Sequence, residues 1–225
     1  MAALRSLAPT FLAVTLLGAS AATARADDPG PLLRAVPWLV LGAHAGVAHP
    51  GGRLGGGSTS TTPRVGELAP TWVPLGLDAG ARLAPRVYVG ASFDWGPTSW
   101  QSGGGCVACG PGSAFEAVAE AQFLLAPRST YDPWLSVASG WDVLHATFGQ
   151  GEASATYSGP VVTRVRFGID VRGHHVAVGP YLGLSVAEFT RHTLSPATPG
   201  VSASVGALAA HEWFTLGIRG TYGAL

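Results

Sequence analysis

Apolar and polar residues alternate with a period of two along most of this chain, a pattern typical of β-strands whose two faces meet different surroundings. Segment 161–172 is the clearest case, because one of its faces is apolar and the other contains Arg164, Arg166 and Asp170. The apolar face is predicted to consist of Val161, Thr163, Val165, Phe167, Ile169 and Val171. No segment after residue 26 has convincing helical periodicity, so the pattern predicts an all-β protein.

Eight strands are predicted in this way, at residues 36–49, 71–84, 86–96, 114–126, 134–145, 161–172, 176–190 and 214–222. Residues 201–210 alternate in the opposite phase, which predicts a bulge or turn near 210–213 and makes them the upper arm of the last hairpin. Short turns alternate with longer, glycine-rich connections. This order predicts an antiparallel up-and-down transmembrane β-barrel with long extracellular loops and short periplasmic turns.

The charged residues of the strands decide which face points outward. An arginine that faces lipid near the bilayer midplane costs about 2–4 kcal/mol, and an acid costs less. We therefore expect the polar face to line the lumen and the aliphatic face to contact lipid, the reverse of a soluble barrel. The predicted lumen charges are Asp78, Arg82, Asp94, Glu116, Glu120, Asp142, Arg164, Arg166, Asp170 and Arg219.

Composition agrees with a chain that needs an apolar solvent. Charged residues make up only 12% of the 225 residues, 32 are glycine, and the mean hydropathy is +0.30. All 13 basic residues are arginine, balanced by 13 carboxylates, and no basic patch favours nucleic acid.

The N-terminal segment has the features of a secretory signal peptide. Arg5 precedes an apolar stretch over residues 7–24, and Ala24-Arg25-Ala26 forms a small-x-small cleavage site. We expect residues 1–26 to be removed, residues 27–35 to form a short N-terminal segment, and residues 36–225 to form the barrel domain. A permanent membrane anchor is the alternative, but Pro9 and Gly18 weaken it.

The two cysteines, Cys106 and Cys109, lie in a glycine-rich loop. Outside the cytoplasm such a pair predicts a disulfide at the loop tip. A redox Cys-x-x-Cys motif would normally open a helix, and a zinc site would need further ligands nearby. No metal or other cofactor is therefore predicted.

Five short motifs carry a resemblance to a known family: Val-Pro-Leu-Gly-Leu-Asp-Ala-Gly (73–80), Tyr-Val-Gly-Ala (88–91), Asp-Pro-Trp-Leu (132–135), Val-Gly-Pro-Tyr (178–181) and His-Glu-Trp-Phe-Thr-Leu-Gly-Ile-Arg-Gly-Thr-Tyr (211–222). Over its mature length the chain resembles small eight-stranded outer-membrane barrels of the OmpA, OmpX and OmpW type, in particular uncharacterised barrels of high-GC Gram-negative bacteria. The resemblance implies a monomer in the cell outer membrane, in contact with its lipids and lipopolysaccharide. It also implies insertion by the barrel-assembly machinery, which reads a terminal aromatic residue such as Tyr222.

Three functions remain open on the sequence. The lumen charges predict an ion-pair network that fills a narrow barrel, consistent with a structural or surface-interaction role. The alternative is a narrow passive channel, with room left by inward glycines at 76, 80, 90, 140, 168, 179, 183 and 217. A lipid A-modifying enzyme is the least favoured, because neither a His-x-Ser-Asn motif nor a Gly-x-Ser-x-Gly elbow occurs. We therefore predict that the protein is not an enzyme.

Overall fold

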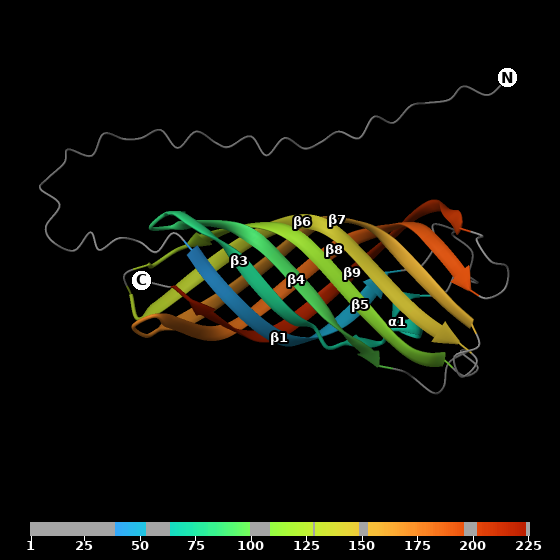
Figure 1. The fold of residues 1–225 in the computed structure, drawn as a ribbon, viewed down its shortest axis with the longest axis horizontal. Helices are drawn as coiled ribbons and strands as arrows, with labels where there is room; N and C mark the ends of the chain where they lie inside the picture. Colours follow the sequence, from blue (N-terminus) through green and yellow to red (C-terminus); the bar gives the residue numbers. More distant parts are fainter. Residues whose placement is uncertain are drawn as a thin grey trace, which may run out of the picture. The chain divides into compact units, whose positions relative to one another are not determined.

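A ring of antiparallel strands forms the described part of the chain (Figure 1). The computed structural model describes residues 39–52, 64–99, 109–127, 129–148, 153–195 and 202–223. Its elements are β1 (Leu39–Gly52), the one-turn helix α1 (Val65–Leu68), β2 (Thr71–Trp72), β3 (Leu75–Ala84), β4 (Val87–Ser99), β5 (Cys109–Leu124), β6 (Tyr131–Phe148), β7 (Ala153–Arg172), β8 (Val176–Ser195) and β9 (Ser202–Tyr222). Each long strand pairs with its neighbour in sequence, and β1 pairs with β9, from Leu41↔Tyr222 to Gly52↔His211. The predicted barrel is confirmed.

Strands β2 and β3 act as one strand of the barrel. The pairing of β1 with Trp72 of β2 continues in the same register to Leu75 of β3, across the break at Val73 and Pro74. The interruption follows from Pro74, which has no N–H to donate to the ladder. Pro74 still accepts a hydrogen bond of 3.0 Å from the amide of Gly46. The ring therefore contains eight strands, as the alternation predicts.

Short turns join the strands at one end of the barrel, at residues 85–86, 125–130 and 173–175. The C-terminal end of β9 lies at this end, and α1 lies toward the other, which we call the upper end (Figure 1). Strands β7, β8 and β9 contain 20, 20 and 21 residues. At about 3.3 Å per residue and a tilt of about 45°, such a strand rises about 50 Å, beyond the ~30 Å hydrocarbon core. These strands are thus longer than predicted.

The outer face of the barrel is apolar, and the charged side chains point inward. Leu77, Leu216 and Ile218 are each more than 60% exposed. Many other aliphatic and aromatic side chains of the same face are exposed to a smaller extent. Trp95 and Tyr222 lie outside, whereas Trp72, Trp134 and Trp213 are buried in the lumen. This arrangement fits a barrel whose surroundings are lipid.

Two irregularities differ from the predictions. The register of β7 against β8 shifts on both sides of Val161, and this bulge leaves Val161 fully buried and Val162 exposed. The prediction that Val161 belongs to the outer face is therefore wrong. Strand β9 runs unbroken through 210–213, and its register against β8 shifts instead between Ser204 and Ala209.

Two predictions concern residues outside the described ranges. The signal peptide at 1–26 and the segment 27–35 lie there entirely, as does Cys106, so the cleavage and the Cys106–Cys109 disulfide stay predictions. Within the described ranges, none of the helical structure is long and apolar enough to span a membrane.

Candidate functional site

The lumen holds a network of buried ion pairs at mid-height, centred on two arginines of β7. Arg164 contacts three carboxylates, at 2.7 Å from Asp94, 2.7 Å from Glu116 and 3.2 Å from Glu120. Strands β4 and β5 supply these carboxylates from across the barrel. All four side chains are at least nine-tenths buried, so these ion pairs lie away from bulk water.

Arg166 extends the network toward β3. It donates to Asp94 at 2.9 Å and to the Ser92 hydroxyl at 3.0 Å, and it lies 3.8 Å from Asp78. Its guanidinium also lies over the ring of Tyr181, 5.5 Å from the centroid. Asp94 therefore joins both arginines in one cluster.

His44 of β1 is the member that the sequence reasoning missed. Its two ring nitrogens lie 2.9 Å from Asp78 Oδ2 and 2.5 Å from Asp94 Oδ1. Its position in the alternation could have predicted that it faces the lumen, because His44 shares the inward face of β1 with the buried Val40 and Ala48. Alternation alone could have placed it inside, but not beside two carboxylates of β3 and β4.

A second ion-pair cluster lies nearer the turn end. Arg219 of β9 contacts Asp170 at 2.6 Å and donates a 2.8 Å hydrogen bond to the side-chain oxygen of Gln122. Its guanidinium stacks on Trp134, 3.5 Å from the ring centroid, and Trp134 Nε1 donates to Asp170 at 2.9 Å. Below this cluster, Arg172 pairs with Asp132 and donates to the carbonyl of Pro127.

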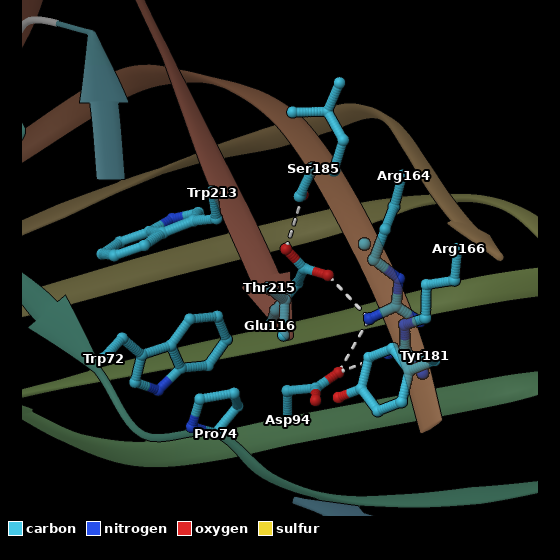
Figure 2. Close-up of a pocket in the computed structure, with 12 residues that line it drawn as sticks. Trp72, Pro74, Asp94, Glu116, Arg164, Arg166, Tyr181, Ser185, Trp213 and Thr215 are labelled. Atoms are coloured by element: carbon cyan, nitrogen blue, oxygen red, sulfur yellow. Dashed lines mark hydrogen bonds and ion pairs between the residues drawn. The ribbon is translucent and has the colours of Figure 1, made fainter. Parts of the chain in front are cut away.

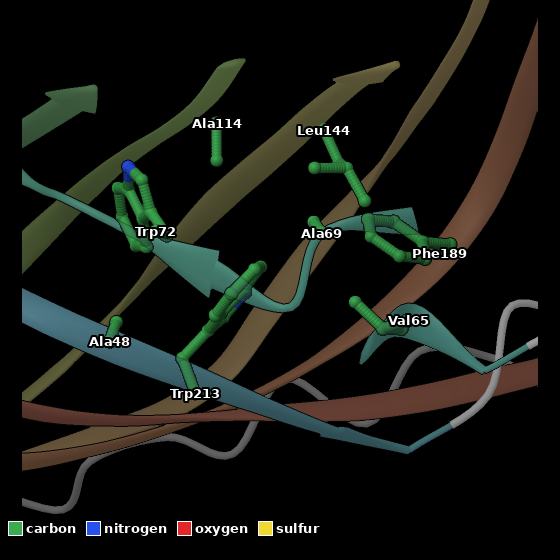
Figure 3. Packing of buried hydrophobic residues seen from close by; sticks show 8 residues of the cluster. All are labelled: Ala48, Val65, Ala69, Trp72, Ala114, Leu144, Phe189 and Trp213. Carbon is green, nitrogen blue, oxygen red and sulfur yellow. The ribbon is translucent and has the colours of Figure 1, made fainter. Parts of the chain in front are cut away.

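A cluster of packed apolar side chains, which we call the apolar cap, lies in the upper part of the described lumen (Figure 3). The cap consists of Ala48, Val65, Ala69, Trp72, Ala114, Leu144, Phe189 and Trp213. Helix α1 supplies Val65, and Figure 3 shows this side chain close to Phe189. Asp142 lies beside the cap and is held by His211 at 2.7 Å and by Trp213 Nε1 at 3.4 Å.

Five of the eight inward glycines provide room for an aromatic or imidazole ring. A methyl group on Gly76 would overlap the His44 ring, and one on Gly90 would overlap Tyr88. Similar overlaps would arise at Gly80 with Tyr88, at Gly168 with Trp134 and at Gly217 with Tyr181. At these five positions the space left by the missing side chain is occupied by a neighbouring ring.

Small cavities lie between these layers in the described part of the lumen, among them two of about 20 Å³ each. That volume holds about one water molecule. The upper cavity separates the indoles of Trp72 and Trp213 from the pair formed by Glu116 and Arg164 (Figure 2). Ser185 donates to the other oxygen of Glu116 at 2.8 Å, so this carboxylate is held from two sides.

Each predicted lumen charge lies on the inner face of the barrel. Nine of the ten are buried, and Arg82 is partly exposed beside the lower cavity. The structure brings Asp78, Asp94, Glu116, Glu120, Arg164 and Arg166 into one cluster, and Asp170 and Arg219 into the second. Asp142 pairs with His211 instead of an arginine. Among the described residues, no group of three or more His, Cys, Asp or Glu side chains is placed to hold a metal ion.

Comparison with solved structures identifies the class of fold. Neisserial surface protein A superposes with a TM-score of 0.55 at 11% identity, covering 82% of this chain and 96% of that one. A major outer membrane protein of Thermus thermophilus gives 0.46 at 13% identity (82% and 98% covered), and OprG of Pseudomonas aeruginosa gives 0.44 at 12% identity (82% and 95% covered). The sequence matches no family model and no curated protein.

The closed ring of strands and the apolar outer face thus identify the chain as a transmembrane β-barrel. Within that class it has the fold of the small eight-stranded outer-membrane barrels, as the likeness to Neisserial surface protein A shows. The predicted resemblance is confirmed at the level of architecture.

Proposed function

We propose that this protein is a non-conducting barrel of the bacterial outer membrane that supports a structured surface above the bilayer. Its lumen charges serve the fold: they replace a hydrophobic core with buried ion pairs. Outer-membrane lipids and lipopolysaccharide surround a monomer, and the barrel-assembly machinery inserts it. These assignments rest on the fold class together with the apolar outer face.

The observation that carries this proposal is the dense packing of the described part of the lumen. An ion that crosses the barrel must pass the apolar cap, the cluster around Arg164 and Arg166, and the cluster around Arg219. The described cavities between them hold about one water molecule each. An apolar constriction resists ion passage because ions cannot shed their water there without a large cost.

The upper strands support the surface role. Above the apolar belt, Arg191 and Thr193 of β8 are exposed, although they share the strand phase of Ala187 and Phe189, which are buried in the lumen lower on the strand. Their backbone stays paired with β7 and β9 up to Thr193. A hydrogen-bonded wall that projects into water offers a rigid base for loops that bind partners.

Single-channel recording in planar bilayers tests the closed lumen. We expect no stepwise current from the refolded protein across many insertions, with membrane insertion verified by protease protection. Stepwise currents that change in the variants Arg164→Ala or Glu116→Gln would overturn the proposal in favour of the narrow channel.

The absence of catalysis is part of the same proposal. The two buried histidine–carboxylate pairs, at His44 and His211, lie inside the closed lumen, and the nearby Ser185 donates to Glu116 rather than to an imidazole. A nucleophile needs a base within hydrogen-bonding reach. Lipid A from cells that express the protein is expected to keep its mass, and a changed acyl composition would contradict this.

A further inference from the structure

His44 projects from β1 into the central charged cluster, and its side chain is fully buried. Asp78 Oδ2 of β3 lies 2.9 Å from the ring nitrogen Nδ1, and Asp94 Oδ1 of β4 lies 2.5 Å from Nε2. Both ring nitrogens therefore meet a carboxylate oxygen. Through these two contacts, His44 ties the first strand of the ring to β3 and β4.

The two contacts require two N–H donors. A neutral imidazole has one N–H group and one bare lone pair, so it donates to only one of the two carboxylates. Its other nitrogen would face the second carboxylate lone pair against lone pair, inside a lumen where little water separates them. An imidazolium ring has two N–H groups and donates to both carboxylates. The geometry thus calls for one proton more than a neutral histidine carries.

The surroundings of the two carboxylates place this proton on the ring. Asp94 Oδ2 accepts from Arg164 at 2.7 Å and from Arg166 at 2.9 Å, and two guanidinium donors favour the ionised carboxylate. Asp78 Oδ1 lies 3.8 Å from the guanidinium of Arg166, which also favours the anion. Two anions therefore face His44.

The charge of the central cluster supports the same assignment. Its other ionisable side chains are Asp78, Asp94, Glu116, Glu120, Arg164 and Arg166. These four carboxylates and two arginines leave two negative charges in excess if the histidine is neutral. A proton on His44 removes one of them. The gain is large because each of these side chains is at least nine-tenths buried.

Arg166, Tyr181 and Arg219 face His44 from the remaining strands. Arg166 of β7 opposes a second cation nearby, but it contacts the same two carboxylates, which lie between the two positive groups. Tyr181 of β8 presents its ring edge to the imidazole, with 5.9 Å between the centroids. Arg219 of β9 is the register partner of His44, and its guanidinium is paired with Asp170.

We propose that His44 is an imidazolium cation in the folded barrel and that its proton is a pH-sensitive lock between β1 and the strands β3 and β4. Above about pH 6.5, a histidine of the unfolded chain is mostly neutral. The folded barrel then binds one proton more than the unfolded chain, so its stability falls as the pH rises. The loss ends at the pH at which the folded barrel itself releases the proton.

Nitrogen NMR of the histidine rings tests the assignment. In the refolded barrel, labelled with ¹⁵N-histidine and held at about pH 8, where a free histidine is neutral, we expect two N–H signals from His44, one from each ring nitrogen. His44→Gln removes both signals and thereby identifies them. A single N–H signal from His44 would overturn the proposal, because the proton would then be absent or bound to Asp78.

Urea unfolding between about pH 6 and pH 9 measures the consequence for stability. The unfolding constant of the wild type is expected to rise more steeply with pH than that of His44→Gln, by up to about tenfold per pH unit. The matched control is His49→Gln, at an exposed position of the same strand, which should follow the wild type. Parallel pH profiles for the wild type and His44→Gln would overturn the lock.

Asp78→Asn covers the case in which His44→Gln does not form the barrel, as judged by heat-modifiable migration on a gel. The asparagine amide can donate to Nδ1, so a neutral His44 satisfies both contacts. We expect one N–H signal to disappear at about pH 8 and the pH profile of unfolding to flatten. Two unchanged signals with an unchanged profile would overturn the proposal. Stepwise currents in planar bilayers would instead overturn only the non-conducting role.

Discussion

Arg164 forms ion pairs with three carboxylates, more than the other arginines of the described lumen. Its guanidinium meets Asp94, Glu116 and Glu120, and none of these carboxylates is more than 4% exposed. A buried charge that loses its partner must either stay ionised in a poor solvent or take up a proton, and both reduce stability.

Arg164→Leu is therefore expected to lower the free energy of unfolding by about 3–5 kcal/mol, the usual cost of breaking a buried ion pair. Urea titration of the refolded barrel measures this. The matched control is Arg191→Leu, at an exposed position above the belt, where we expect a change within about 0.5 kcal/mol. Equal losses in the two variants would contradict a stabilising role of the network.

Gly76 tests the packing of the rings in the lumen. A Cβ atom there would overlap His44, which cannot move aside because both of its ring nitrogens contact carboxylates. Gly76→Ala is expected to cost about 1–3 kcal/mol by overpacking. For comparison, a Cβ atom on Gly220 would meet nothing closer than 3.8 Å. Equal urea midpoints for Gly76→Ala and Gly220→Ala would show that the lumen has spare room.

Alternation predicts which residues face the lumen but not which of them meet. The inward placement of Asp94 and Arg164 follows from the period of two along β4 and β7. Their contact depends on how far each strand is staggered around the ring, and no local pattern encodes that stagger. His44 and His211 were missed for the same reason, since their carboxylate partners come from strands distant in the sequence.

At the scale of the element, β8 divides into two environments. Leu182 lies in the lower part and is 59% exposed on the apolar face, whereas Thr193 is exposed in the part that extends above the belt. The lower part needs an apolar solvent. The upper part needs water for its polar side chains.

An arginine scan along β8 tests this division. Leu182→Arg is expected to cost about 2–4 kcal/mol if the residue lies near the bilayer midplane. Thr193→Arg is expected to change stability by no more than about 0.5 kcal/mol, as for an ordinary surface site. Unfolding in lipid vesicles measures both. A large cost at position 193 would place the upper end of β8 inside the membrane.

Strand ends and bulges are the elements that the sequence predicts least well. Above the belt both faces of a strand meet polar or small residues, so the apolar alternation that marks a strand fades although the backbone pairing continues. At Val161 and Val162 two adjacent valines fit either face, and the bulge decides between them. The apolar alternation of the sequence therefore matches the strand pairing only where one face of the strand meets lipid and the other meets the lumen.

At the scale of the whole molecule, the described part of the lumen contains two layers of different chemistry. The apolar cap contains Trp213, and the charged cluster beneath it contains Arg166; Figure 2 shows the two residues on opposite sides of Glu116. In the proposed non-conducting barrel, the cap would exclude ions by dewetting, and the charged cluster would exclude them by filling the lumen with paired side chains. Loss of one layer leaves the other in place.

Conductance in planar bilayers is therefore expected to respond only to the combined loss. Trp213→Ala alone and Arg166→Ala alone should give no stepwise current, whereas the double variant should give one, because it opens the cap and also removes side-chain volume from the cluster below. Heat-modifiable migration of all three variants controls for folding. Currents from either single variant would show that one layer carries the whole barrier, and the lumen would then be a gated channel instead of a filled core.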